Sequence, residues 1–238
     1  GNTSIVRPGD DQGTGFVSFF LGSTSGGNVQ FSTPTTGNFV LPADAKAYVA
    51  LGQSATTFYM LDTLLSAPTH TLTVSGAMYP GWASGVSSYS VIPGPPAQLG
   101  WGTPARRLIA GTTWQFEAGA TTNTVVAARL LDQFGNLTTS AQTYVVRYTS
   151  NKGTTYAGAN PNAVIVATAP SASWSNITPG VYLGVSIPGG SGLSQAPMYF
   201  WDTVAGTATI TAQAQLLGVD VFSPLTQEHR ITAAKAAY

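Results

Sequence analysis

The chain has 238 residues and a mass of 24.5 kDa, enough for one large domain or two ordinary domains that each bury a core. Only 8% of the residues are charged, and nine basic residues balance nine acidic ones, which excludes an electrostatic case for nucleic acid or an anionic membrane as partner. The absence of cysteine excludes disulfides, Cys-ligated zinc and thiol nucleophiles.

Strand-forming residues dominate the chain, because short runs of Val, Ile, Thr, Tyr and Phe alternate with Gly, Pro, Asn and Ser. Residues 16–21 lead through a Gly-rich turn into residues 29–31, which predicts a hairpin. Residues 69–74 and 207–211 alternate with period two, and residues 124–131 and 143–149 are typical of central strands. Residues 227–237 are expected to form a last strand and a tail. The predicted fold class is all-β.

A proline-rich break over residues 93–96 divides the chain. Such a stretch lacks backbone donors and favours an extended conformation, which suits a linker. We therefore expect one domain over residues 1–92 and another over residues 97–238. No apolar run reaches the roughly 18 residues of a membrane span. The first residue is Gly rather than Met, so we expect a processed chain, or a fragment, whose targeting segment is gone.

The two halves share a repeat. Residues 59–63 (YMLDT) followed by 69–74 match residues 199–203 (YFWDT) followed by 207–212. In both copies an Asp, Asp62 or Asp202, stands where a strand ends, and its side chain is expected to cap backbone N–H groups. Residues 97–135 have no counterpart in the first half. The first repeat is therefore expected to lack its two opening strands, a gap that another strand should fill by β-augmentation.

Five short segments of the second half follow one another in a characteristic order: Pro96–Leu99, Leu108–Gly111, Asp132–Asn136, Tyr199–Thr203 and Ala205–Thr207. In this order they resemble the bacterial immunoglobulin-like cell-surface repeats of the invasin and intimin-like, Big-type group. The resemblance implies two tandem immunoglobulin-like β-sandwich domains, of which the first lacks its opening strands. It also implies an extracellular, cell-surface location.

These observations predict a non-enzymatic structural protein, a self-assembling subunit of a pilus-like filament or a surface layer. Its partner would be a second copy, bound through β-strand complementation with either residues 2–6 or residues 231–238 as donor. The alternatives are an adhesin stalk or tip that binds a host protein or glycan, and a polysaccharide-binding accessory domain. The expected subunit-interface residues lie near the chain ends or in aromatic loops: Asn2, Ile5, Val6, Tyr79, Trp82, Trp101, Ile231 and Tyr238.

Few residues suggest chemistry at a site. No cofactor is expected apart from a structural calcium ion, which needs several converging oxygens and has as weak candidates Asp10, Asp11, Asp132 and Asp202. His70 and His229 are expected at the surface or at a sheet edge. No G-x-S-x-G motif is present, so no catalytic residue is predicted. The acceptor pattern for N-glycosylation occurs at three positions: Asn2, Asn136 and Asn176.

Overall fold

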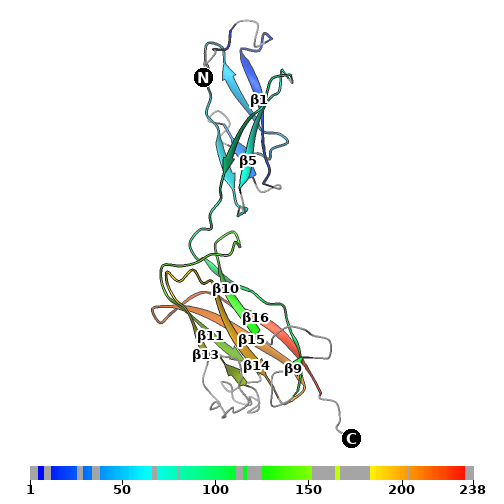
Figure 1. Cartoon of the computed structure of the whole chain (residues 1–238), viewed down its shortest axis with the longest axis vertical. Coiled ribbons are helices and arrows are strands. Elements are labelled where there is room, and N and C mark those ends of the chain that lie inside the picture. The colour runs from blue at the N-terminus through cyan, green and yellow to red at the C-terminus, as the bar shows by residue number, and fades with distance from the viewer. Residues whose placement is uncertain are drawn as a thin grey trace. The chain divides into compact units, whose positions relative to one another are not determined.

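The computed structural model describes residues 5–7, 12–25, 29–33, 38–65, 69–79, 81–110, 115–116, 125–151, 164–166, 183–202 and 204–233. These residues form an all-β protein (Figure 1). The described part of the chain contains no helix, and so none long and apolar enough to cross a membrane. The chain divides into two compact units, Gly1–Pro93 and Gly94–Tyr238, at a point within the proline-rich stretch.

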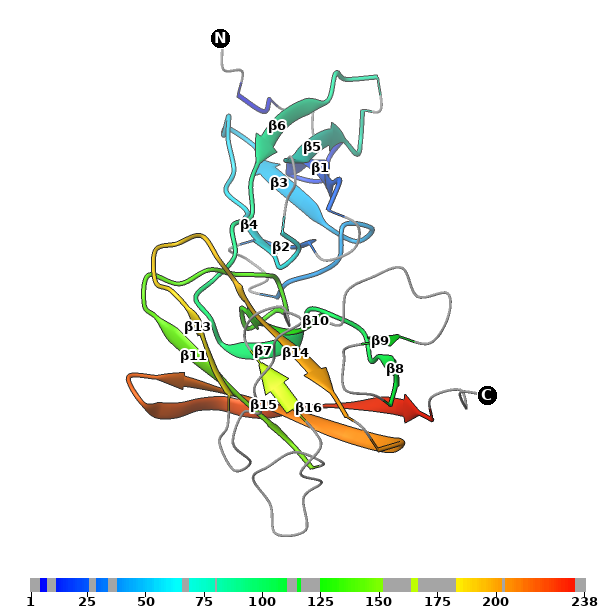
Figure 2. The same ribbon diagram turned by 60° about the horizontal axis from the view of Figure 1, so that its bottom comes forward.

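The first unit contains two sheets, which can be followed in Figure 2. The larger sheet has the order β3-β1-β5-β6, and the smaller consists of β2 and β4. All pairings in both sheets are antiparallel. The strands are β1 (Phe16–Ser23), β2 (Val29–Ser32), β3 (Lys46–Ala50), β4 (Tyr59–Asp62), β5 (His70–Gly76) and β6 (Gly85–Tyr89).

The core of the first unit lies between these two sheets. Alternation along each strand places its apolar residues on one face, so β1 supplies Leu21, β3 supplies Ala47, and β2 supplies Val29 and Phe31. Ala45, directly before β3, joins the same core. Further apolar residues pack against this cluster while remaining partly exposed, namely Phe58, Met60, Leu72 and Val74.

One strand pairing expected from the sequence is wrong. The runs at residues 16–21 and 29–31 do form strands, but β1 pairs with β3 and β5, whereas β2 pairs with β4 in the other sheet. The Gly-rich connection therefore crosses between the two sheets. The sequence pattern is the same in both cases, because apolar alternation marks a strand and does not identify its partner.

The second unit is a β-sandwich with more strands in each sheet. One sheet has the order β12-β14-β10-β7 and the other β13-β11-β15-β16-β8-β9. The strands are β7 (Gln98–Trp101), β8 (Arg107–Ile109), β9 (Gln115–Phe116), β10 (Val125–Leu131), β11 (Tyr144–Ser150), β12 (Val164–Val166), β13 (Leu183–Ile187), β14 (Gln195–Trp201), β15 (Gly206–Leu216) and β16 (Val219–Thr232).

The apolar residues between the two sheets of this sandwich are almost completely shielded from solvent. Alternate residues of β15, from Ala208 to Ala214, are 0% exposed, as the strict period-two pattern predicts. Tyr148 on β11 reaches across to the other sheet, where its hydroxyl accepts a hydrogen bond from the Ala128 N–H (2.8 Å) and donates one to the Ala196 carbonyl. Burial raises the pKa of this phenol, which therefore stays protonated.

Strands β15 and β16 form a long hairpin, drawn in orange and red in Figure 1. Its two-residue turn, Leu217-Gly218, has positive φ at both positions (51° and 81°), which defines a type I′ turn. Lower in the hairpin, β16 bulges between the Ala212 and Ala214 pairs, and Pro224 lies in the bulge where no ladder donor is required.

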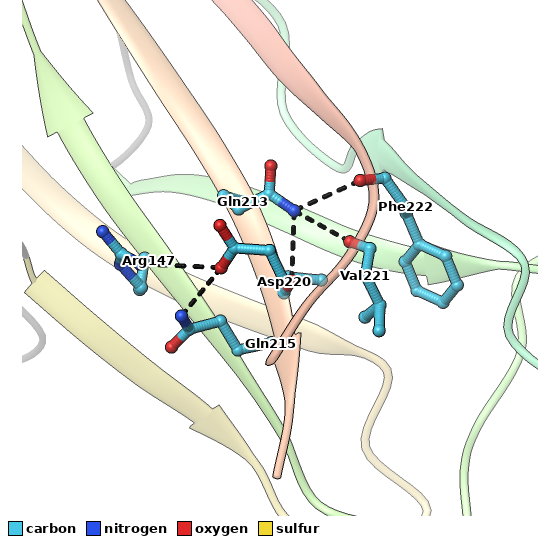
Figure 3. A network of polar contacts seen from close by, with 7 residues as sticks. Arg147, Gln213, Gln215, Asp220, Val221 and Phe222 are labelled. Carbon is cyan, nitrogen blue, oxygen red and sulfur yellow. Dashed lines mark hydrogen bonds and ion pairs between the residues drawn. The ribbon is translucent and has the colours of Figure 1, made fainter. Parts of the chain in front are cut away.

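Figure 3 shows how side chains hold this bulge. The Gln213 side-chain amide donates to the carbonyls of Val221 (2.8 Å) and Phe222 (3.2 Å). Nearer the turn, Asp220 accepts a hydrogen bond from the Gln215 amide (2.7 Å) and lies 3.5 Å from the Arg147 guanidinium. Carbonyls that leave the ladder at the bulge thus keep a partner.

Candidate subunit interface

The two units share one topological plan. The order β3-β1-β5-β6 matches β13-β11-β15-β16, and β2-β4 matches β12-β14. The matching Asp residues also cap the backbone in the same way. Asp62 accepts a hydrogen bond from the Leu64 N–H (3.0 Å), and Asp202 accepts one from the Val204 N–H (2.8 Å). The predicted caps at these two strand ends are confirmed.

The second unit contains four strands that have no counterpart among the described strands of the first unit. These are β7, β8, β9 and β10, of which β10 lies beside β14 and β8 beside β16. In the first unit the matching positions are the edge of β4 away from β2 and the edge of β6 away from β5. Neither edge has a neighbouring strand within the described ranges.

The inner face of the first unit is incompletely covered as a result. In the second unit the additional strands supply core residues, namely Leu99, Leu108, Val126, Ala128 and Leu130. β5 matches β15, whose core-facing residues are fully buried, but the core-facing Leu72 and Val74 of β5 stay partly exposed. The apolar side chains that would complete this sandwich are not supplied by the described residues of the unit itself.

Residues 55–59 form the open edge next to this incompletely covered face, and we call them the acceptor edge. The repeat aligns Tyr59 with Tyr199, so residues 55–58 correspond to residues 195–198, which belong to β14 and pair with β10. Residues 55–58 themselves are not in a strand, and residues 55–57 are exposed. Phe58 and Met60 face the core, as Met198 and Phe200 do in the second unit.

An apolar groove adjoins the acceptor edge. Its floor is the inner face of the larger sheet beyond the core, formed by Val17, Phe19 and Val49. Ile5, Val6, Ser54 and Trp82 complete the lining, and the cavity measures about 250 Å³. Because Ser54 directly precedes residue 55, the groove and the acceptor edge form one continuous surface.

Local hydrogen bonds place the groove walls. The Val6 N–H donates to the Gln53 carbonyl (2.7 Å), and the Gly52 N–H donates to the Val6 carbonyl (2.8 Å). The Tyr79 and Trp82 rings stack at 4.7 Å. Their tight turn requires Gly76, because a Cβ added there would collide with the Tyr79 carbonyl.

The structure places the predicted interface residues differently from one another. Ile5, Val6 and Trp82 line the groove, with Tyr79 stacked on Trp82. Trp101 is half-buried in the second unit and donates through Nε1 to the Thr226 carbonyl (3.0 Å). Two further predicted residues, Asn2 and Tyr238, lie outside the described residues, and Ile231 is buried in the second unit.

Ile231 requires a correction. It is 2% exposed and belongs to the core of the second unit, where β16 pairs with β15 and, in parallel, with β8. A side chain buried between its own sheets does not serve as an exposed contact, so the interpretation of Ile231 as an interface residue is wrong. Apolar residues near a chain end are ambiguous between these two roles in sequence alone.

The carboxylates proposed for calcium act as turn caps where they are described. Asp132 is 1% exposed and accepts hydrogen bonds from the N–H groups of Gly94, Phe134 and Asn136 and from the Asn136 amide. Burial would raise the pKa of Asp132, but these hydrogen bonds outweigh it and lower the pKa. No group of three metal-ligating side chains occurs within the described ranges. Asp202 caps its own turn, and Asp10 and Asp11 lie outside the described residues.

The glycosylation candidates have one described member. Asn136 is half-buried, and its side-chain amide donates to Asp132 Oδ2 at 3.1 Å. Asn2 and Asn176 lie outside the described residues.

The first unit contains a cluster of hydrogen-bonded polar side chains that the sequence analysis missed. Asp62 accepts hydrogen bonds from the hydroxyls of Tyr89 (2.7 Å) and Ser25 (2.8 Å), and Tyr89 lies 2.6 Å from the Ser23 hydroxyl. Burial acts to raise the pKa of Asp62, but these bonds and the Leu64 N–H lower it. Burial, together with Asp62, raises the pKa of Tyr89. The cluster ties β4 to β1 and β6 and so fixes one end of β4.

His229 is also not where the sequence placed it. It is 0% exposed on β16, and its Nδ1 accepts a hydrogen bond from the Arg106 N–H at 3.1 Å. The expectation of a surface or edge histidine is wrong for this residue.

No protein-family model matches the chain, and no curated protein matches its sequence.

Proposed function

We propose that this protein is an extracellular structural protein without catalytic activity, a subunit that assembles with copies of itself into a cell-surface filament or layer. The proposed mechanism is β-strand complementation, in which a strand from another subunit adds to the first unit. The observation that carries the proposal is the acceptor edge, which adjoins partly exposed apolar residues at the position where the second unit has β10 and β7.

Physical reasons favour occupation of this edge. A sheet edge with unpaired N–H and C=O groups beside exposed apolar side chains is a template for pairing with another chain. Each 100 Å² of apolar surface removed from water contributes about 2.5 kcal/mol. The balanced and sparse charge of the chain adds little repulsion between copies. The resemblance to immunoglobulin-like surface repeats supports a location outside the cell.

Two neighbouring threonines allow a matched test. Thr56 and Thr57 are both exposed in the first unit. Their matches in β14 differ, because Ala196 is 0% exposed beneath the sheet while Pro197 is exposed. A lysine at position 56 would therefore be buried once a strand is added, and an inward-pointing lysine is a natural device against edge pairing. A lysine at position 57 would stay in solvent.

The experiment compares polymer formation by the unchanged chain, Thr56→Lys and Thr57→Lys. We expect filaments or sheets in electron micrographs, and rapidly sedimenting material, for the unchanged chain and Thr57→Lys but not for Thr56→Lys. Circular dichroism checks that both variants stay folded. Polymers of Thr56→Lys would exclude complementation at this edge, and an unchanged chain that stays monomeric at high concentration would overturn self-assembly itself.

A further inference from the structure

We infer that the acceptor edge takes an antiparallel strand of one defined register, with small or branched apolar side chains at alternate positions. This inference deepens the proposed function, because it names the chemistry and alignment of the strand that the first unit receives. It rests on the second unit, which contains such a strand at the matching position.

The register follows from β10 and β14. Val125 lies opposite Tyr199, Ala127 opposite Pro197, and Arg129 opposite Gln195. The repeat aligns the three β14 residues with Tyr59, Thr57 and Ala55 of the acceptor edge. A strand in the place of β10 would therefore put its Ala127 position opposite Thr57 and its Arg129 position opposite Ala55.

The alternation sets the side-chain chemistry. Val126, Ala128 and Leu130 point inward from β10 and are at most 1% exposed, whereas Arg129 is partly exposed on the other side. The incoming strand should thus read apolar-x-apolar-x-apolar, with tolerance for polar residues between. A charged residue at one of the inward positions would be buried without a partner.

The apolar groove fits the last of these inward positions. One residue beyond the Arg129 position, the strand places its Leu130 position opposite Ser54, which lines the groove with Val17, Phe19 and Trp82. The matched strand pairings align Val17 and Phe19 with Tyr144 and Val146, which share a core with Leu130 in the second unit. The groove of about 250 Å³ is therefore the space for an incoming leucine.

One difference between the units enlarges the space for the middle inward side chain of the incoming strand, at its Ala128 position. The same pairings align Leu21 with Tyr148, the residue whose hydroxyl bonds Ala128 and Ala196 in the second unit. Leucine is shorter and has no hydroxyl. The first unit should therefore accept a valine at the Ala128 position, which in the second unit holds a fully buried alanine next to the Tyr148 hydroxyl.

Disulfide trapping tests the register, because the protein has no cysteine of its own. The probe is a synthetic peptide with the sequence of residues 124–131, TVVAARLL. Directly opposed residues in an antiparallel pair have Cα atoms about 4.5–5.5 Å apart, within disulfide range, whereas diagonal neighbours are roughly 7–8 Å apart. The Thr57→Cys and Ala55→Cys proteins are each mixed with peptides carrying Cys at the Ala127 or the Arg129 position.

We expect the pairs Thr57→Cys with the Ala127 peptide and Ala55→Cys with the Arg129 peptide to cross-link about tenfold more than the crossed pairs. A lysine at the peptide's Leu130 position should abolish cross-linking, and a valine at its Ala128 position should raise it. Equal yields from all four pairs, or an unaffected lysine peptide, would overturn the inference.

The outcome separates the two proposals. Cross-linking in register without polymers of the unchanged chain would keep the acceptor edge and refute self-assembly, since the strand would then come from another part of a longer polypeptide or from another protein. Polymers without any register-specific cross-link would keep self-assembly and refute the strand acceptor.

Discussion

The buried His229 predicts that the second unit loses stability in mild acid. Its Nδ1 already accepts the Arg106 N–H, so the neutral ring must carry its proton on Nε2. A second proton on Nδ1 would face that N–H donor. Burial, reinforced by the positive charge of Arg106, lowers the pKa of His229 from 6.5 to about 4.

The sign and size of the effect follow from this difference. Between pH 6.5 and about 4, the unfolded chain binds a proton at His229 that the folded chain excludes. Stability is therefore complete above pH 6.5 and falls with acidification, by up to about 1.4 kcal/mol for each pH unit within the window. The total loss is about 3 kcal/mol between neutral pH and pH 4, a large part of the stability of an ordinary domain.

The assay is urea unfolding of the full chain at intervals from pH 7.5 to 4.5, following the transition of the second unit. The His229→Gln variant keeps an acceptor for the Arg106 N–H but does not titrate, so its free energy of unfolding should vary little over this range. His70→Gln, which changes the other histidine, should retain the dependence. The reasoning would be refuted if the free energy of unfolding changed equally with pH in His229→Gln and in the unchanged chain. It would also be refuted if NMR showed His229 of the folded protein titrating near pH 6.5.

Three further changes test individual contacts through the free energy of unfolding. Leu217→Asn relieves a non-glycine residue at positive φ in a type I′ turn and should stabilise by about 1 kcal/mol. Tyr148→Phe leaves the Ala128 N–H and Ala196 carbonyl without their hydroxyl partner and should cost about 2–3 kcal/mol. Asp132→Asn replaces Oδ2, which accepts from the Gly94 N–H and the Asn136 amide, with a donor; urea titration should show a loss of about 2 kcal/mol at pH 7 that shrinks as the pH falls below 3.8 and disappears once the lowered pKa of Asp132 is passed.

The sequence predicted the strands well because most of them bury only one face. Alternation over residues 69–74 and 207–211 corresponds to β5 and β15, and the central positions of β10 and β11 are confirmed. The caps at Asp62 and Asp202 were also predictable, because each carboxylate accepts a hydrogen bond from the N–H only two residues later, and such a contact depends on the local sequence alone. Local rules thus identified local structure.

Nonlocal features escaped the same reasoning. The partner of β1 depends on which sheet the chain joins after the Gly-rich turn, and alternation carries no such information. His229 is one polar residue in an otherwise suitable strand pattern, and only the meeting of β16 with the segment around Arg106 buries it. The Asp62 cluster likewise joins residues that are 27 and 37 positions apart in sequence.

The acceptor edge shows where the sequence and the structure each contribute. The repeat alone indicates that the first half has fewer strands than the second, but a count of strands does not say which edge is open. The sheet orders identify the edge of β4, and the core-facing Phe58 and Met60 determine which of its residues point inward. Since a shift of one residue would exchange the inward and outward faces, the different roles assigned to Thr56 and Thr57 depend on that phase, and the paired lysine variants test it directly.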